Sequence, residues 1–264
     1  SQILLTLDDT EERRRSINAK STFENLFQLN YIPIVNENDT IATSEIKYGD
    51  NDRLAARVAQ IIGADTLIIF SDVDGLYNRG NKRELIKEVK NLSHKIYRLA
   101  DKKLNSYGSG GMITKLDAAA ICMNSGCHMF IANGNKKNPI NYMFKNKIFT
   151  RFVPKISTLA ARKKWIVSSL SSNGTIYIDR GAAKAIENGK SLLAAGIKLI
   201  KGKFSKGDNV IINDENNNKL ARGLASFSSK EIEMIKGRQS NEIEKILGYP
   251  SKTEVIHKDD MVKL

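Results

Sequence analysis

The sequence has few of the residues that build metal and disulfide sites. It contains two cysteines, Cys122 and Cys127, and three histidines in 264 residues. Neither cysteine has a further Cys or a paired His near it, so the spacing of a structural zinc site is missing. Two cysteines in a chain of this length fit the reducing cytoplasm, where disulfides are rare. We therefore expect a cytoplasmic protein, and the sequence names no protein ligand for a metal.

Long hydrophobic runs are also missing. No apolar run approaches the ~20 residues that a membrane helix needs. The N-terminal residues, SQILLTLDDTEERRR, lack the layout of a signal peptide and contain no initiating Met. These features predict a protein with no membrane partner, and they are consistent with a fragment of a longer chain.

Acidic residues are scarce relative to basic ones. The chain has 42 Lys and Arg against 29 Asp and Glu, a net charge of +13, and a pI near 9.6. Such a charge attracts polyanions, although a Lys-rich composition explains it equally well. With 41% hydrophobic residues, the chain can form a packed core in one large or two ordinary domains.

Two clusters of acidic and amide side chains lie within IVNENDTIATSEIKYGDND, at residues 36–39 and 49–52. The apolar run at residues 31–35 predicts a buried strand before them, and ligands of open α/β sheets bind at the carboxyl ends of strands. Turns and helix caps explain either cluster alone. Together, the clusters offer carboxylates for an ammonium group and amides for carboxylates, which favours a small amino acid as ligand.

The segments around these clusters alternate between strand and helix patterns. Strands are expected at residues 2–6, 66–70, 85–89 and 128–132, and helices from residue 21, over 53–62 with Asp52 as cap, from residue 93, and over 116–123. This alternation of strands and helices predicts a parallel sheet covered by helices.

A glycine-rich loop, NSYGSGGMITK, precedes the last of these helices and places Lys115 at its start. Backbone amides, the helix dipole and an ammonium group would converge there on a phosphate. The alternative is a loop made mobile by its Gly and Ser residues, and the spacing alone does not decide between the two.

The pattern changes beyond about residue 150. Residues 154–164 contain Pro154 and the basic run 162–164, as an interdomain connection does. Strands are expected at residues 175–178, 210–213 and 224–227, and helices at 182–186 and 241–247. Short strands separated by polar turns favour a small β-rich barrel.

In this order, NEND, GDND, SDVDGLY and GSGGMITK resemble the motifs of the amino-acid kinase family, in its glutamate 5-kinase branch. GKFSKGDNVIINDENNNKLARGLASFSSKEI and SNEIEKILGY resemble the PUA domain that follows many of these kinases. The resemblance implies an α/β fold: a three-layer αβα sandwich with a mainly parallel sheet, plus a small β-barrel-like PUA domain. The expected domains are residues 1–153, the C-terminal portion of the kinase, then a linker at 154–164 and the PUA domain at 165–264. The strand, lysine and serine loop that open the family's pattern are absent here.

The resemblance also implies roles for individual residues. Asp39 and Asn51 match residues that hold glutamate, and Asn36 and Asp52 line the same pocket. The nucleotide is assigned to Ser71, Asp72, Ser109, Gly110, Gly111, Met112, Ile113, Thr114 and Lys115. Lys115 matches the catalytic lysine that stabilises negative charge during transfer, whereas Asp74 receives no role beyond a turn or solvent contact.

The implied reaction moves the γ-phosphoryl group of ATP onto the γ-carboxylate of L-glutamate, giving L-glutamyl 5-phosphate in the first step of proline biosynthesis, with Mg²⁺ bridging the phosphates. A carboxylate is already an anionic nucleophile, so the site must supply alignment and charge neutralisation rather than a base. Feedback inhibition by proline and a homo-oligomer, dimer or tetramer, are also implied.

A competing interpretation is an RNA-binding PUA protein with a non-catalytic α/β scaffold. The net charge and the PUA resemblance support it. A scaffold, however, has no need of four ligand-type loops at successive strand ends, so the kinase is the favoured prediction.

Overall fold

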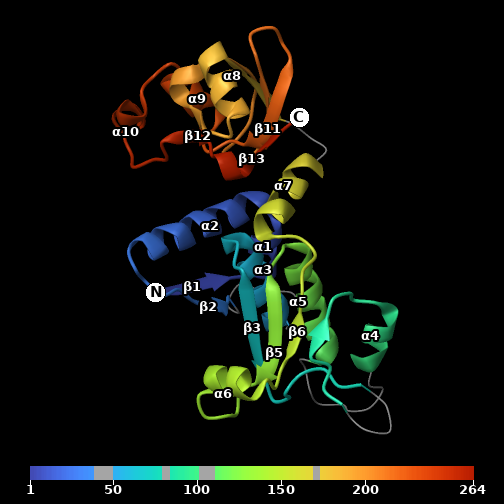
Figure 1. Ribbon diagram of the computed structural model, residues 1–264. Coiled ribbons are helices and arrows are strands. Elements are labelled where there is room, and N and C mark those ends of the chain that lie inside the picture. Colours follow the sequence, from blue (N-terminus) through green and yellow to red (C-terminus); the bar gives the residue numbers. More distant parts are fainter. Residues whose placement is uncertain (39–49, 79–83, 101–110, 169–172) are drawn as a thin grey trace. The chain divides into compact units, whose positions relative to one another are not determined.

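The computed structural model describes residues 1–38, 50–78, 84–100, 111–168 and 173–264 (Figure 1). The chain divides into two compact units, Ser1–Ala161 and Arg162–Leu264. The division falls inside the expected linker at 154–164, and part of that linker belongs to helix α7 (Thr158–Ser168). Within the described ranges, no helix has the length and apolar character needed to cross a bilayer.

Unit 1 alternates between strands and helices. Its elements are β1 (Gln2–Leu5), α1 (Leu7–Glu11), α2 (Arg13–Gln28), β2 (Ile34–Glu37), α3 (Asp50–Ile62), β3 (Thr66–Ser71), β4 (Glu88–Val89), α4 (His94–Ala100), α5 (Met112–Asn124), β5 (His128–Asn133), α6 (Pro139–Asn146), β6 (Thr150–Phe152) and the start of α7. The strands expected at 2–6, 66–70 and 128–132 are confirmed, and the one expected at 85–89 is reduced to β4.

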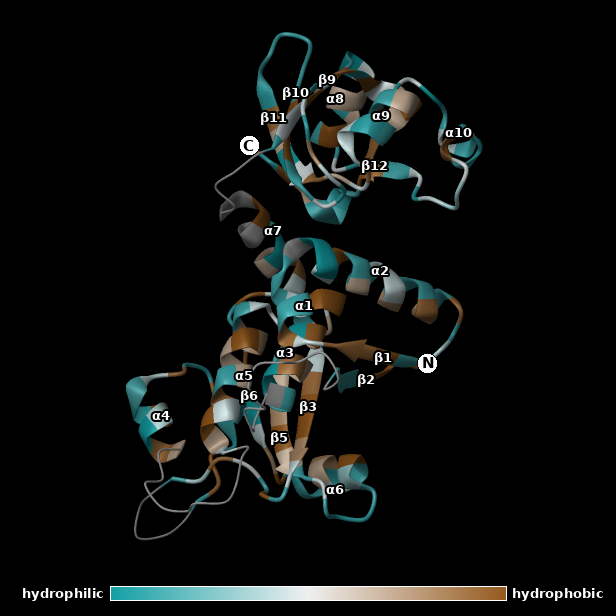
Figure 2. Cartoon of the chain, turned by 180° about the vertical axis from the view of Figure 1, so that it is seen from behind, coloured by the Kyte–Doolittle hydropathy of each residue, from teal (hydrophilic) through white to brown (hydrophobic). Residues whose placement is uncertain are grey.

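The main sheet of unit 1 has the strand order β3-β5-β6-β4. Strands β3 and β5 run parallel with Ser71 beside Asn133, and β6 runs antiparallel to β5. Apolar side chains of β3 and β5 pack with those of α3 and α5 in one core, and Figure 2 shows both strands mostly in brown. Because β3 and β5 are parallel, their carboxyl ends meet at one edge, where ligands bind in α/β sheets.

The apolar run at residues 31–35 is not the buried strand that we predicted. Strand β2 begins only at Ile34 and pairs with β1 in a separate two-stranded parallel sheet. Ile32 and Ile34 are 82% and 68% exposed, whereas Val35 packs beside Leu5 in a small core. Successive side chains of a strand point to opposite faces, so a sheet that is covered on one face buries only every second residue.

The helix expected from residue 21 is present but begins earlier, as α2 at Arg13, and the short helix α1 precedes it. Thr6 and Asp9 form a capping box at the start of α1. The carboxylate of Glu12 accepts hydrogen bonds from the backbone N–H groups of Arg14 and Arg15, and it caps α2. The charged segment before residue 21 is therefore helical, because Thr6 with Asp9, and Glu12, satisfy free N–H groups at the two helix starts.

Unit 2 is the β-rich domain that the sequence predicts. Its elements after α7 are β7 (Gly174–Ile178), α8 (Arg180–Glu187), β8 (Leu192–Leu193), η1 (Ala194–Gly196), β9 (Ile197–Gly202), β10 (Asn209–Asn213), β11 (Lys219–Leu224), α9 (Ser229–Ile235), η2 (Ser240–Glu242), α10 (Ile243–Leu247), β12 (Glu254–Ile256), η3 (Lys258–Asp260) and β13 (Met261–Lys263). Five strands form one sheet in the order β13-β11-β10-β7-β9 around an apolar core. The strand expected at 224–227 was misplaced, since β11 ends at Leu224 and Phe227 is a buried core residue outside it.

Candidate active site

Two of the sequence motifs meet through helices α3 and α5, which pack against each other in unit 1. Asp52 lies in the first turn of α3, and Lys115 lies in the first turn of α5. The Nζ atom of Lys115 is 3.0 Å from Oδ2 of Asp52, although the two residues are 63 positions apart in the sequence. An ion pair therefore joins the GDND cluster to the glycine-rich motif.

This ion pair is largely removed from solvent. The side chains of Lys115 and Asp52 are 9% and 15% exposed. A buried ammonium group requires an opposite charge, and the positive end of the α5 dipole increases that requirement at Lys115. Asp52 supplies the charge from within α3, rather than acting as the cap of that helix as we predicted.

Thr114 adds a hydroxyl group to the same cluster. Its Oγ1 is 2.8 Å from Oδ2 of Asp52 and also 2.8 Å from the carbonyl oxygen of Gly111. Because a hydroxyl has one proton, Thr114 donates to one of these acceptors at a time. Asp52 thus contacts both polar side chains at the start of α5.

The start of α5 differs from the sequence prediction. Met112, Ile113, Thr114 and Lys115 form its first turn instead of a loop, and Gly111 is the N-cap without a side-chain acceptor for the free N–H groups. Ser109 and Gly110 lie outside the described residues. A helix start with no side-chain cap presents its backbone N–H groups to an anion.

The predicted glutamate residues come from β2 and α3, two elements in contact with each other. Asn36 is exposed near the end of β2, and its Nδ2 donates a 3.3 Å hydrogen bond to the carbonyl oxygen of Glu37. Asn51 is exposed in the first turn of α3. Both side chains are accessible to a ligand, whereas Asp39 lies outside the described residues.

The predicted nucleotide residues Ser71 and Asp72 lie where β3 ends. Ser71 donates a hydrogen bond from Oγ to Oδ1 of Asp72 at 3.0 Å, and the side chain of Asp72 is exposed. The backbone N–H of Gly134, just after β5, donates to the carbonyl oxygen of Ser71 at 2.8 Å. This turn is therefore held against the end of the neighbouring strand.

Thr150, which the sequence did not single out, holds the other side of the turn. Its buried hydroxyl accepts the N–H of Leu76 at 2.8 Å and donates to the carbonyl oxygen of Ile86 at 2.7 Å. A Cβ atom on Gly75 would lie 2.4 Å from that hydroxyl, so only glycine fits there. Thr150 follows this turn by more than seventy positions in the chain, and no local pattern indicates the contact.

The described residues contain no group of three or more His, Cys, Asp or Glu side chains able to hold a metal ion. The hydrogen bond between the thiols of buried Cys122 and Cys127 raises the pKa of Cys122 and lowers that of Cys127, but the pair has no third ligand. These residues do not form a magnesium cage by themselves. Magnesium often binds through substrate phosphates and one or two carboxylates, so it fits this site as part of the nucleotide substrate.

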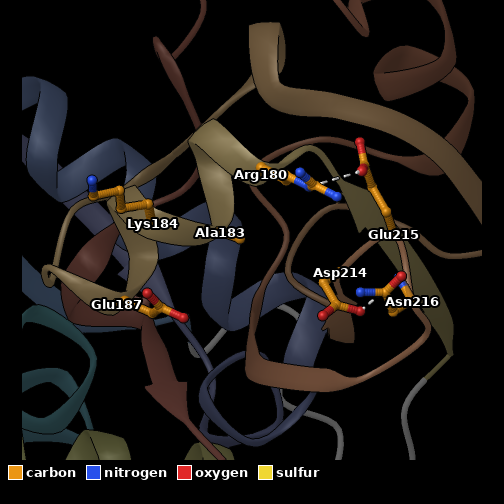
Figure 3. A pocket seen from close by; sticks show the side chains of 7 residues that line it. All are labelled: Arg180, Ala183, Lys184, Glu187, Asp214, Glu215 and Asn216. Carbon is orange, nitrogen blue, oxygen red and sulfur yellow. Dashed lines mark hydrogen bonds and ion pairs between the residues drawn. The ribbon is translucent and has the colours of Figure 1, made fainter.

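Unit 2 has a cavity between α8 and the turn that joins β10 to β11 (Figure 3). Its volume of about 230 Å³ is below the range of small-molecule sites. In Figure 3, Arg180 and Glu215 point toward each other, at 3.8 Å between Nε and Oε2. The lining carries both signs of charge, and Asp214 is held by hydrogen bonds from Asn216 and Asn218. This cavity has none of the features of the predicted catalytic site.

Comparison with known proteins assigns both units. The model of the amino acid kinase family matches residues 1–133, and the PUA domain model matches residues 174–247. A glutamate 5-kinase from Pelagibacter ubique is 61% identical over all of this chain and 73% of its own length. Another, from Paramagnetospirillum magneticum, is 47% identical over 99% of this chain and 72% of its own length. Among solved structures, UMP kinase from Ureaplasma parvum has a TM-score of 0.35 at 14% identity, covering 51% of this chain and 52% of that chain, and this likeness adds nothing to the argument.

The family match and the fold define the class of protein as an amino acid kinase domain followed by a PUA domain, which confirms the fold class expected from the sequence. The two relatives that match over nearly the whole chain, at 61% and 47% identity, are both glutamate 5-kinases. The chain belongs to the glutamate 5-kinase family.

Proposed function

We propose that this protein transfers the γ-phosphoryl group of ATP to the γ-carboxylate of L-glutamate and forms L-glutamyl 5-phosphate, the first intermediate of proline biosynthesis. The observation that carries this proposal is the buried ion pair between Asp52 and Lys115. It places an ammonium group beside an uncapped helix start, in a domain of the amino acid kinase family.

Lys115 neutralises the negative charge that shifts between the phosphates and the acceptor during transfer. Phosphoryl transfer depends mainly on positioning and electrostatic stabilisation, because the carboxylate nucleophile needs no general base. Asp52 orients Lys115: their 3.0 Å contact fixes the ammonium group before the substrates bind. A charge that is already in place needs no reorganisation in the transition state.

Glutamate is held by Asn36, Asp39 and Asn51, with Asp52 at the boundary with the phosphates. The carboxylate of Asp39 pairs with the substrate's ammonium group, and the exposed amides of Asn36 and Asn51 donate to its carboxylates. ATP lies between the turn at Ser71 and Asp72 and the start of α5, and Ser109 and Gly110 of the glycine-rich motif also bind it. Magnesium enters with ATP and binds through the phosphates.

Proline, the end product of the pathway, competes for the glutamate pocket, because it keeps an α-carboxylate and a cationic nitrogen. The enzyme works in the cytoplasm as a homo-oligomer, a dimer or tetramer. RNA is a further candidate partner of unit 2, where Lys198, Lys201, Lys203 and Lys206 are all exposed.

The test is ADP release by the purified full-length protein with a panel of acceptors. We expect release to depend on L-glutamate and to saturate with it, while D-glutamate, L-aspartate and L-glutamine support much less. D-glutamate reverses the α-carbon, aspartate shortens the chain, and glutamine lacks the γ-carboxylate. Equal ADP release with all four compounds, or none above the rate without acceptor, would refute the proposed acceptor.

A further inference from the structure

The turn after β3 is tied to β5 by a side-chain contact that none of the sequence motifs indicates. The Nδ2 of Asn133 donates to Oδ1 of Asp74 at 3.1 Å. The hydroxyl of Tyr77 donates to Oδ2 of Asp74 at 3.0 Å. Asp74 therefore uses one oxygen to hold its own turn and the other to hold the neighbouring strand.

The orientation of the Asn133 amide follows from a second contact. Its Oδ1 accepts a 2.9 Å hydrogen bond from the backbone N–H of Asn135. Since the oxygen side of the amide faces a donor, the nitrogen side faces the Asp74 carboxylate, where only a donor fits. Both ends of the Asn133 side chain are thus satisfied, and its position is fixed at the end of β5.

The strand register places this contact beside the predicted nucleotide residues. Ser71 and Asn133 are paired neighbours in the parallel ladder of β3 and β5. Asp74 follows Ser71 by three residues. The hydrogen bond from Asn133 to Asp74 therefore holds the turn that contains Ser71 and Asp72 against the end of β5. Gly134 reinforces this contact, because its N–H donates to Ser71 and a Cβ atom there would lie 2.9 Å from Cβ of Phe70.

We propose that Asp74 and Asn133 form a positioning pair that holds the turn at residues 71–75 in the conformation that binds the nucleotide. Neither residue needs to touch the nucleotide, because each acts through the backbone of the turn. The proposal rests on the proposed function only in taking this turn as the nucleotide-binding one. Loss of the contact leaves a turn that must be ordered when the nucleotide binds, and this weakens nucleotide affinity while leaving the glutamate pocket unchanged.

The test measures nucleotide affinity separately from catalysis. Asp74→Ala, Asn133→Ala and the double variant of the full-length protein are compared by calorimetric titration with a non-hydrolysable magnesium–ATP analogue. Each single variant should weaken binding by about fivefold to tenfold, the effect of one hydrogen bond, and the double variant by no more than the stronger single one. Asp74→Asn, which keeps an oxygen facing Asn133, should recover most of the affinity.

Asn146→Ala is the matched control. Asn146 is the last residue of α6, and its Nδ2 also makes one hydrogen bond, to the carbonyl oxygen of Tyr142. This variant should leave nucleotide affinity within twofold of the parent. In steady-state assays, the positioning variants should raise the KM for ATP and leave the KM for glutamate unchanged. If Asp74→Ala does not fold, nucleotide affinity is compared in Asn133→Ala and Asp74→Asn instead.

Multiplicative effects in the double variant, unchanged affinity in both single variants, or an equal rise in both KM values would overturn the positioning pair. Failure of the proposed acceptor gives a different pattern: the parent protein would bind the nucleotide analogue, and the variants would weaken that binding, without any glutamate-dependent ADP release.

Discussion

Replacing only Asp52 of the ion pair between Asp52 and Lys115 should lower the unfolding free energy strongly, and replacing Lys115 as well should restore part of it. Asp52→Ala removes the Asp52 carboxylate from the ammonium group of Lys115, in a site where that side chain is 9% exposed. Removing one partner of a buried pair typically costs about 3–5 kcal/mol of unfolding free energy. Adding Lys115→Met removes the buried charge that has lost its Asp52 partner and keeps the apolar stem, so the double variant should be more stable than Asp52→Ala alone.

The magnitude can be tested against an exposed ion pair on the same helix. Arg57 of α3 pairs with Glu11 at 3.0 Å, and their side chains are 32% and 57% exposed. Pairs of this kind typically contribute ~0.2–1 kcal/mol, so a double-mutant cycle on Arg57 and Glu11 should give a coupling energy in that range. The cycle on Asp52 and Lys115 should give about 2 kcal/mol or more.

The assay is amide hydrogen exchange in α3 and α5, which reports the opening free energy of these two helices separately from unit 2. Kinetics complete the prediction: Lys115→Met should lower kcat by roughly 10²-fold or more in the folded enzyme, because it removes a charge that acts in the transition state. A double variant no more stable than Asp52→Ala, or a coupling energy equal to that of the exposed pair, would refute the structural reasoning. An unchanged kcat in Lys115→Met would refute the catalytic role.

Three further predictions concern substrates and the division of labour between the units. Asn51→Ala and Asp39→Ala should raise the KM for glutamate by about tenfold and leave the KM for ATP nearly unchanged, and equal effects on both would count against the glutamate assignment. Inhibition by proline should weaken as glutamate rises, whereas noncompetitive inhibition would indicate a separate site. Truncation after Ser168, where α7 ends, should leave a folded unit 1 with kinase activity, and a folded but inactive truncated enzyme would contradict the assignment of catalysis to unit 1.

The sequence predicts the alternation of strands and helices because the local pattern carries that information. Gly63, at φ +69°, ends α3 where the sequence predicts, and Gly126, at φ +81°, ends α5 in the same way. The start of α5 was missed, because Gly111 caps it without any polar side chain and the glycine run before it resembles a loop. The exposure of Ile32 and Ile34 was missed for a related reason, since an apolar β-branched run reads the same whether or not both faces of its sheet are covered.

Individual site residues were predictable only where a motif carries them. Asp52 and Lys115 were both candidates, but their contact across 63 residues has no local signal. The contact adds the orientation of Lys115 to the substrate-pocket role proposed for Asp52. Asp74, Asn133 and Thr150 act through partners on other strands, so their contacts depend on the register of the sheet.

The most direct test of the proposed reaction is to trap its product. The full-length enzyme is incubated with magnesium–ATP, L-glutamate and hydroxylamine, which converts an acyl phosphate into a hydroxamate. We expect γ-glutamyl hydroxamate and ADP to form in equal amounts, and both to be lost together in Lys115→Met. ADP formation without the γ-hydroxamate would show that the phosphoryl group goes to another acceptor, and it would contradict the assignment of the glutamate γ-carboxylate as the nucleophile.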